Sequence, residues 1–254
     1  MKIAVVGVGQ MGSAMIEGLS KNPKNELVAE NHKNPRVEKL SEKLNFNLVN
    51  TITELINLKP EIVILTLPAK VTIEVVKKLK NLDAIFISAA AGVSYQSLLK
   101  ALPNKTIARI IPNTPVSIQA GTIGLFTPPD IIKEDKKKIS ELLKQLGDVV
   151  EVSEDNLSII GTIGGCGPAF VDVFIEALNE AGVLNGLESQ TATQLAASMV
   201  KGSASLVLKS EKSPSELRAQ VCSPGGTTIQ GVVSLEKNGF RYAVIDAVNQ
   251  ANKN

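Results

Sequence analysis

Residues 2–12, KIAVVGVGQMG, decide the fold of the N-terminal half of the chain. An apolar run that fits a β-strand leads directly into a GxGxxG motif, and a helical pattern begins within the motif. The first glycine permits the tight turn, the second lets the backbone approach a pyrophosphate, and the third lets helix and strand pack closely. The stretch predicts a dinucleotide-binding loop made of Gly7, Val8, Gly9, Gln10, Met11 and Gly12. A glycine-rich turn without a ligand is the alternative.

Outward from this loop, β-rich runs alternate with helical patterns as far as about Val152. Runs such as EIVILTL at 61–67 and AIFISAA at 84–90 are nearly continuous in apolar residues. Such runs are typical of a parallel sheet covered by helices on both faces. Helical patterns dominate the rest of the chain. We therefore predict an α/β fold with an N-terminal Rossmann dinucleotide-binding domain at 1–153 and an all-helical C-terminal domain at 154–254.

One late helix of the first half has a distinct pattern. Asp130 can cap its N-terminus, and Gly147 follows its C-terminal end. Its apolar residues form one stripe, which predicts a buried helix face: Ile139, Leu142, Leu143 and Leu146.

Small residues run through one helical pattern of the second half, which allows another helix to approach closely. These residues are Ala192, Ala196, Ala197, Ser198, Gly202, Ser203, Ala204 and Ser205. An intertwined dimer interface is one interpretation, and a tightly packed monomeric bundle is the other. Residues 145–200 also contain no Lys, Arg or His.

Composition excludes several classes of function. The chain has 254 residues with 27 Lys+Arg against 25 Asp+Glu, no Trp, 2 Tyr and 6 Phe, so nucleic acid is not expected as a partner. The only two cysteines, Cys166 and Cys222, indicate neither a disulfide framework nor a zinc cluster, and His32 is the only histidine, so no metal site is predicted. The N-terminal apolar run is too short for a signal peptide, and no run of about 18 uninterrupted apolar residues occurs. We expect a cytoplasmic protein outside the membrane.

The end of the second predicted strand bears on the choice of nicotinamide cofactor. An acidic side chain there accepts from a free ribose 2′-OH, whereas cations accommodate a 2′-phosphate. Glu30 could be the ribose acid, but the next residues supply several donors to a phosphate: Asn31, His32, Lys33 and Arg36. We favour NADPH, with NADH as the alternative. A solvated loop would explain His32 and Lys33 equally simply.

A second glycine motif, VCSPGGTTIQG at 221–231, lies in the helical half. A Pro-Gly-Gly turn that runs straight into a helix leaves backbone N–H groups unpaired at the helix start. Hydroxyls at Ser223, Thr227 and Thr228 lie beside them. The motif predicts an anion pocket for a substrate carboxylate. The alternative is that Ser223 and Thr227 only cap the helix.

Five segments together resemble the pyrroline-5-carboxylate reductase family over essentially the whole chain. They are GVGQMGSAMIEGL at 7–19, SAAAGV at 88–93, RIIPNTP at 109–115, GCGPAF at 165–170 and VCSPGGTTIQG at 221–231. The resemblance implies a Rossmann domain followed by a dimerising helical domain, often with dimers gathered into rings. It also implies hydride transfer from NADPH or NADH to the C=N carbon of 1-pyrroline-5-carboxylate, which gives L-proline in the last step of proline biosynthesis.

The resemblance also implies roles for individual residues. The pyrophosphate would lie at Gly7–Gly12 and the adenosine ribose at Asn31, His32 and Lys33. Further cofactor contacts would come from Thr66, Leu67, Pro68 and Ala69, where the family has Ala-Val-Lys-Pro, and from Ala90, Ala91, Gly92, Pro112, Asn113 and Thr114. The substrate would bind at Val221, Gly225, Gly226, Thr227 and Thr228, with the Thr228 hydroxyl on the ring nitrogen.

Two other functions compete with imine reduction. A 3-hydroxyacid dehydrogenase needs a lysine or histidine acid/base on the long helix of the second domain, and residues 145–200 offer neither. A catalytically idle NADP-binding regulator could share the fold. A cyclic imine is basic enough to arrive partly protonated, so positioning carries most of the catalysis. We interpret Cys222 and Cys166 as small buried filler residues, since imine reduction needs no nucleophile.

Overall fold

The computed structural model describes residues 1–253, and the chain within it divides into two compact units. The first unit is Met1–Gly165 and the second begins at Cys166. The division falls inside a continuous helical segment, because α7 (Leu157–Gly161), a π-helical turn (Thr162–Cys166) and α8 (Gly167–Leu184) follow one another directly. Our predicted boundary at 153/154 lies just before this segment.

An eight-stranded sheet forms the centre of the first unit, in the order β3-β2-β1-β4-β5-β6-β7-β8. The inner strands are apolar and buried, as predicted. The strands are β1 (Lys2–Val6), β2 (Glu26–Glu30), β3 (Asn47–Val49), β4 (Ile62–Leu65), β5 (Ile85–Ser88), β6 (Ile107–Ile111), β7 (Gly121–Phe126) and β8 (Gly147–Glu151).

The sheet is parallel except at one pair, since β7 runs antiparallel to β6. The sheet is thus predominantly parallel, as the apolar runs indicate, with one reversal that the sequence analysis did not predict. The connection between the two strands holds only the 3-10 helix η1 (Thr114–Ile118), and a parallel crossover needs a dozen or more residues. The β7–β8 pair is parallel again because α6 (Lys133–Leu143) provides a crossover.

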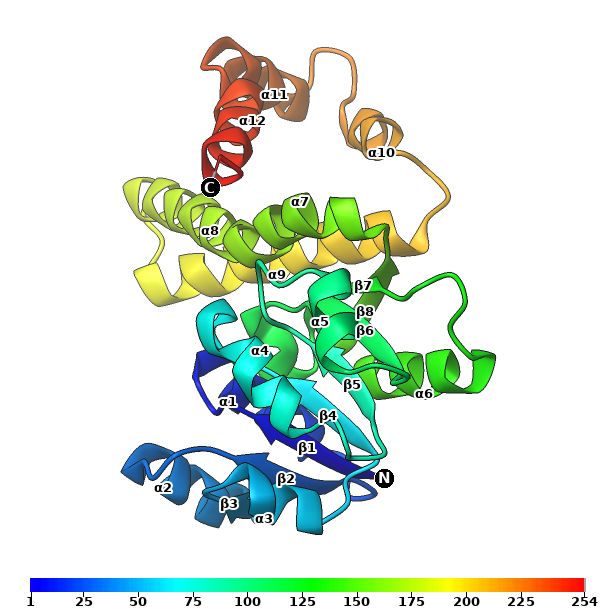
Figure 1. The fold of residues 1–254 in the computed structure, drawn as a ribbon. Coiled ribbons are helices and arrows are strands. Elements are labelled where there is room, and N and C mark those ends of the chain that lie inside the picture. Colours follow the sequence, from blue (N-terminus) through cyan, green and yellow to red (C-terminus); the bar gives the residue numbers. More distant parts are fainter. Residues whose placement is uncertain (254) are drawn as a thin grey trace. The chain divides into compact units, whose positions relative to one another are not determined.

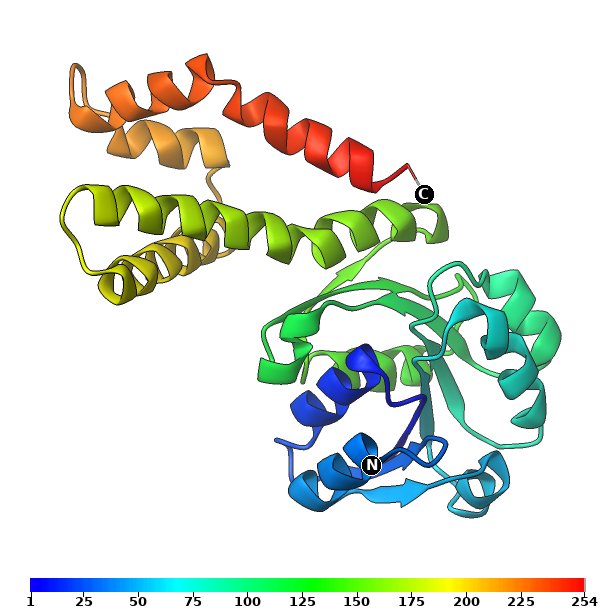
Figure 2. The ribbon, with the colours of Figure 1, turned by 90° about the vertical axis from the view of Figure 1, so that its left-hand side faces the viewer.

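Helices cover both faces of the sheet (Figures 1 and 2). Strand side chains alternate between two apolar clusters: Ile3 and Val5 point into one, and Ala4 and Val6 into the other. The first cluster packs against α1 (Gln10–Leu19), α2 (Pro35–Leu44) and α6, and the second against α3 (Ile52–Asn57), α4 (Ala69–Lys78) and α5 (Tyr95–Ala101). The Rossmann architecture predicted from the sequence is confirmed.

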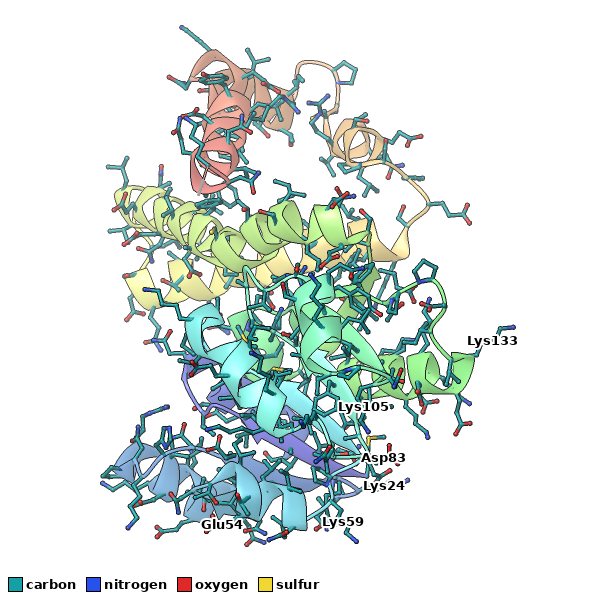
Figure 3. All side chains as sticks on the ribbon, viewed as in Figure 1. Lys24, Glu54, Lys59, Asp83, Lys105 and Lys133 are labelled. Carbon is teal, nitrogen blue, oxygen red and sulfur yellow. The ribbon has the colours of Figure 1, made fainter. Side chains whose placement is uncertain are left out.

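The predicted start of α6 was wrong, although its buried stripe was right. The helix begins at Lys133 with Ile132 in the N-cap position, so Asp130 does not cap it. Glu134 and Asp135 in the first turn provide the negative charge that the helix dipole favours. The first residue, Lys133, points away from the rest of this unit (Figure 3). All four residues of the stripe are fully buried, and Leu146 follows the end of the helix.

An ion pair fixes the start of the helical segment to the sheet. Glu154, in the short 3-10 helix η2 (Glu154–Asn156), accepts from Arg109 of β6 at 2.5 Å and from the backbone N–H of Tyr95 at 2.6 Å. The Arg109 side chain is 10% exposed, so the pair is largely shielded from water. One carboxylate thus joins β6 and the first residue of α5 to the chain that enters α7.

Between Cys166 and residue 253, the second unit contains five helices: α8, α9 (Ser189–Lys209), α10 (Pro214–Val221), α11 (Thr227–Lys237) and α12 (Phe240–Ala251). Helices α8 and α9 pack along one another (Figure 2). Their approach is close because a Cβ on Gly182 would lie 2.8 Å from the Cβ of Ala192. This confirms that small residues let another helix approach.

This unit is not a tightly packed bundle by itself. Among its described residues only Ala192 and Ala196 are buried. Large apolar side chains are exposed instead, with Leu184 at 87%, Leu208 at 74% and Leu195 at 61%. The segment Glu154–Leu184 is also long and apolar enough, by length and composition alone, to cross a membrane.

Candidate functional site

The glycine loop connects β1 to α1 and has the backbone that a bound anion requires. Gly7 has a φ of +90°, and a Cβ there would lie 2.7 Å from Leu67 Cδ2. A Cβ on Gly12 would collide with the Gly7 carbonyl oxygen and lie 2.8 Å from Thr66 Oγ1. Gly9 is the N-cap of α1 without a side-chain cap, and a Cβ on it would meet nothing within 4 Å. The open, uncapped helix start fits a pyrophosphate.

All the predicted cofactor segments follow the carboxyl ends of parallel strands in the first unit. These strands are β1, β2, β4, β5 and β6, so the segments lie along one edge of the sheet. The chain leaves β1 toward β2 on one side, and β4 lies on the other side. Ligands of open α/β sheets bind outside the strand ends at such a switch point.

The segment after β2 is bonded to the glycine loop. Asn31 accepts from the Val8 N–H at 3.0 Å and donates to its neighbour's carbonyl, His32 O, at 2.7 Å. His32 and Lys33 are exposed. Glu30 is buried, and this burial raises the pKa of its carboxyl. The nearby charges of His32 and Lys78 lower this pKa by less than burial raises it. The exposed cations, rather than Asn31, remain available to a 2′-phosphate.

Arg36 has a different environment from the one predicted. We expected it among the donors to a 2′-phosphate, but its guanidinium donates to Val8 O and to Ser13 Oγ. Asn34 accepts from Arg36 N and caps the start of α2. Nothing in the sequence indicated the contact between this helix and the loop.

The segment after β4 supports the loop from the other side. Thr66 donates to Gly7 O at 2.5 Å and to Val6 O at 3.2 Å. Leu67 packs against Gly7, and Pro68 is the N-cap of α4, whose first residue is Ala69. Thr66 therefore fixes the turn around Gly7 through a side-chain hydrogen bond.

The last two predicted segments differ in how exposed they are. After β5, Ala90 is buried, whereas Ala91 and Gly92 are exposed and Gly92 has a φ of +78°. After β6, the buried Asn113 accepts from Thr122 N at 2.8 Å and donates to Gly164 O at 3.0 Å. Its amide thus ties the end of β6 to the π-helical turn. Pro112 is buried and Thr114 is exposed.

The predicted substrate loop lies in the second unit, between α10 and α11. Val221 ends α10, Gly225 has a φ of +69°, and Gly226 is the N-cap of α11 without a side-chain hydrogen bond. The interpretation that Ser223 and Thr227 cap this helix is therefore wrong. Thr227 and Thr228 are exposed on the first turn, and Gln230 donates to Gly225 O at 3.2 Å. The Gly226 N–H donates to Ser223 O at 3.0 Å, whereas the N–H groups of the first turn of α11 have no acceptor within the helix and suit an anion.

The cysteines and the acidic residues form no metal site. Among residues 1–253, no group of three or more His, Cys, Asp or Glu side chains could hold a metal ion. Cys166 and Cys222 are free and only partly buried, so the description of them as buried filler is too strong.

Known proteins match this arrangement along the whole chain. A family model described as pyrroline-5-carboxylate reductase dimerisation matches residues 154–254, and one described as NADP oxidoreductase coenzyme F420-dependent matches residues 2–92. The pyrroline-5-carboxylate reductase of Aquifex aeolicus is 32% identical over 254 residues, which covers 100% of this chain and 96% of the relative. The chain belongs to the pyrroline-5-carboxylate reductase family.

Solved structures of this family agree with the fold of the chain. The NADP-bound pyrroline carboxylate reductase of Plasmodium falciparum has a TM-score of 0.85 at 29% identity and covers 100% of this chain and 96% of its own. The Streptococcus pyogenes enzyme has a TM-score of 0.85 at 32% identity, with 99% and 96% covered. A 3-hydroxyacyl-CoA dehydrogenase from Archaeoglobus fulgidus has a TM-score of 0.52 at 14% identity, which shows a shared fold alone. As a pyrroline-5-carboxylate reductase family member, the chain is an NAD(P)H-dependent oxidoreductase, and the cradle around Gly7, Gly9 and Gly12 fits that cofactor.

Proposed function

We propose that this chain reduces 1-pyrroline-5-carboxylate to L-proline, the last step of proline biosynthesis, in the cytoplasm and with NADPH preferred over NADH. Membership of the family over the full length supports the reaction. The uncapped start of α11, with Thr227 and Thr228 exposed beside it, is the observation that carries the proposal at the level of residues. This helix start offers backbone N–H donors to a carboxylate, and the Thr228 hydroxyl lies next to them.

In this proposal the substrate is held by its two polar groups. Backbone N–H groups of the first turn of α11, from Thr227 onward, bind the carboxylate, with Val221, Gly225 and Gly226 lining the loop. The Thr228 hydroxyl accepts a hydrogen bond from the protonated ring nitrogen, which keeps the positive charge on the C=N group. The bound nicotinamide supplies the hydride. The role of the protein is then to position the imine.

The cofactor would be bound along the edge of the sheet that the strand ends form. Gly7, Val8, Gly9, Gln10, Met11 and Gly12 take the pyrophosphate. Asn31, His32 and Lys33 take the adenosine ribose end. The remaining contacts come from Thr66, Leu67, Pro68, Ala69, Ala90, Ala91, Gly92, Pro112, Asn113 and Thr114. Of these, Pro68, Ala69, Ala91, Gly92 and Thr114 are exposed.

The activity and the cofactor preference can be tested together. We expect NADPH oxidation that depends on pyrroline-5-carboxylate, with kcat/KM about tenfold higher for NADPH than for NADH, because His32 and Lys33 favour a phosphate dianion. The measurement is the ratio of the two kcat/KM values. A preference for NADH would refute the role of His32 and Lys33. NADPH binding without turnover would favour the idle regulator.

We further propose that residues 154–254 form the dimerisation domain, after a Rossmann domain at 1–153. The exposed apolar side chains of the second unit support a partner, and the match of the dimerisation family model begins at 154. A second copy of the chain would cover these side chains, including those of the apolar segment Glu154–Leu184, which would then lie in an interface rather than in a membrane.

Sedimentation tests this assembly. We expect a mass of at least twice 26.9 kDa for the chain, and a larger multiple would indicate a ring of dimers. Leu195→Asp, at a position 61% exposed, is expected to give monomers because it places a charge in the apolar surface. Ile132→Asp is the matched control, since Ile132 is 65% exposed in the first unit. A monomeric wild-type chain would contradict the proposal.

A further inference from the structure

The guanidinium of Arg36 is hydrogen-bonded to the glycine loop and to the helix that follows it. Arg36, the second residue of α2, donates from Nη2 to Val8 O at 2.5 Å and from Nη1 to Ser13 Oγ at 3.0 Å. Val8 is 2% exposed and Ser13 is 8% exposed, so both acceptors lie on well-packed residues. The planar guanidinium therefore joins the residue before the N-cap of α1 to the first turn of that helix.

The same part of the loop is also held from the β2 side. The Val8 N–H donates to Asn31 Oδ1 at 3.0 Å, and the Gly7 N–H donates to Glu30 O at 2.9 Å. Both polar backbone groups of Val8 are thus bound by the segment that follows β2. A peptide unit is planar and trans, so the Val8 carbonyl and the Gly9 N–H point in opposite directions. Fixing Val8 O therefore fixes the direction of the Gly9 N–H, at the open N-cap of α1.

We propose that Arg36 is a positioning residue that sets the glycine loop for the pyrophosphate, and that it is not a ligand of the 2′-phosphate. The proposal rests on the proposed function only in taking this loop as the dinucleotide site. His32 and Lys33 are then the cations of this segment that distinguish a 2′-phosphate from a 2′-hydroxyl. All three residues are exposed, but the Arg36 guanidinium is already hydrogen-bonded to Val8 O and Ser13 Oγ.

The two roles predict different effects on the two cofactors. NADPH and NADH share the pyrophosphate and differ only in the 2′-phosphate. A residue that sets the loop must affect the binding of both equally, and a ligand of the 2′-phosphate must affect NADPH alone.

The test is a fluorescence titration of both reduced cofactors in the absence of substrate. Arg36→Ala is expected to raise the Kd of NADPH and of NADH by about tenfold each, which leaves their ratio unchanged. Lys33→Ala is expected to raise the Kd of NADPH alone. Arg36→Lys keeps the charge but cannot make both guanidinium hydrogen bonds at once, so it is expected to behave nearly as Arg36→Ala does. Lys39→Ala, an exposed site on the same helix, is the control and is expected to change neither value.

Ser13→Ala provides a second variant at the same contact, in case Arg36→Ala does not fold. It removes the Nη1 bond only, so we expect a smaller rise for both cofactors, and no additional rise in the double variant. A loss confined to NADPH in Arg36→Ala, or unchanged Kd values in both variants, would overturn the proposal. If the wild-type chain binds neither cofactor, the dinucleotide site itself is refuted. This outcome is distinguished from failure of the Arg36 proposal because it is measured on the wild type, before any substitution.

Discussion

Gly12→Ala is expected to abolish measurable NADPH binding, with an increase in Kd of roughly a hundredfold or more. A methyl group on Gly12 would collide with the Gly7 carbonyl oxygen, which belongs to the backbone of the loop and cannot move aside as a side chain would. The first turn of α1 must then separate from β1, and the N–H groups of the loop lose their common direction. The same strain should lower the free energy of unfolding by about 2 kcal/mol. Fluorescence titration and thermal melting measure the two effects.

Gly9→Ala separates the two effects. A Cβ on Gly9 meets nothing within 4 Å, and the Gly9 φ of −76° suits any residue. The variant should therefore have the melting temperature of the wild type. Because the methyl group projects into the space proposed for the pyrophosphate, NADPH binding should nevertheless weaken by about tenfold. Normal NADPH binding by Gly9→Ala would place the pyrophosphate elsewhere.

Thr228→Ala is expected to lower kcat/KM for pyrroline-5-carboxylate by roughly ten- to a hundredfold, the usual loss for one charge-assisted hydrogen bond. Gly226 occupies the N-cap of α11, so the change removes no helix cap and stability should be unaffected. NADPH affinity should also be unchanged, since Thr228 has no proposed contact with the cofactor. Steady-state kinetics and a melting curve measure these values.

Two neighbouring variants make the interpretation specific. Thr228→Ser keeps the hydroxyl and should retain most of the activity. Thr227→Ala removes an equally exposed hydroxyl one residue earlier on the same turn, and should cost less because the backbone of Thr227 contributes the N–H. An unchanged kcat/KM in Thr228→Ala would remove Thr228 from the mechanism, while equal losses in both variants would indicate general damage to the turn.

The main elements of the fold were predictable because their signals are local. The inner strands of the first unit are nearly continuous apolar runs, and the three glycines of Gly7–Gly12 indicate a tight turn before a helix. The short elements β3, α3 and α5 were not predicted, although Thr51 and Glu54 form a capping box that could have located α3. The reversal at β7 was missed because it depends on the length of a connection between strands. The cap of α6 was assigned to Asp130 on residue type, whereas the chain turns into the helix only at Lys133.

The sequence allowed us to predict which segments lie at the candidate site, but not the hydrogen bonds that join them. The alternation of strands and helices already implies that the ends of β1, β2, β4, β5 and β6 share an edge. The bond of Arg36 to Val8 joins residues 28 positions apart, and that of Asn113 to Gly164 joins residues 51 apart. Such pairings are set by packing, which leaves no periodic trace in the sequence. The charged series after β2 therefore suggested one phosphate site, whereas in the structure the Arg36 guanidinium is bonded to Val8 and Ser13.

The scarcity of buried side chains in the second unit has a consequence for how the protein responds to dilution. Among the described residues of this unit only Ala192 and Ala196 are buried, so the helices on either side of the proposed substrate loop have almost no core of their own. Their order would come from mass action between copies, whereas the sheet of the first unit keeps two apolar clusters within one chain. If the second unit holds the imine as proposed, dilution of the protein is expected to weaken substrate binding before cofactor binding.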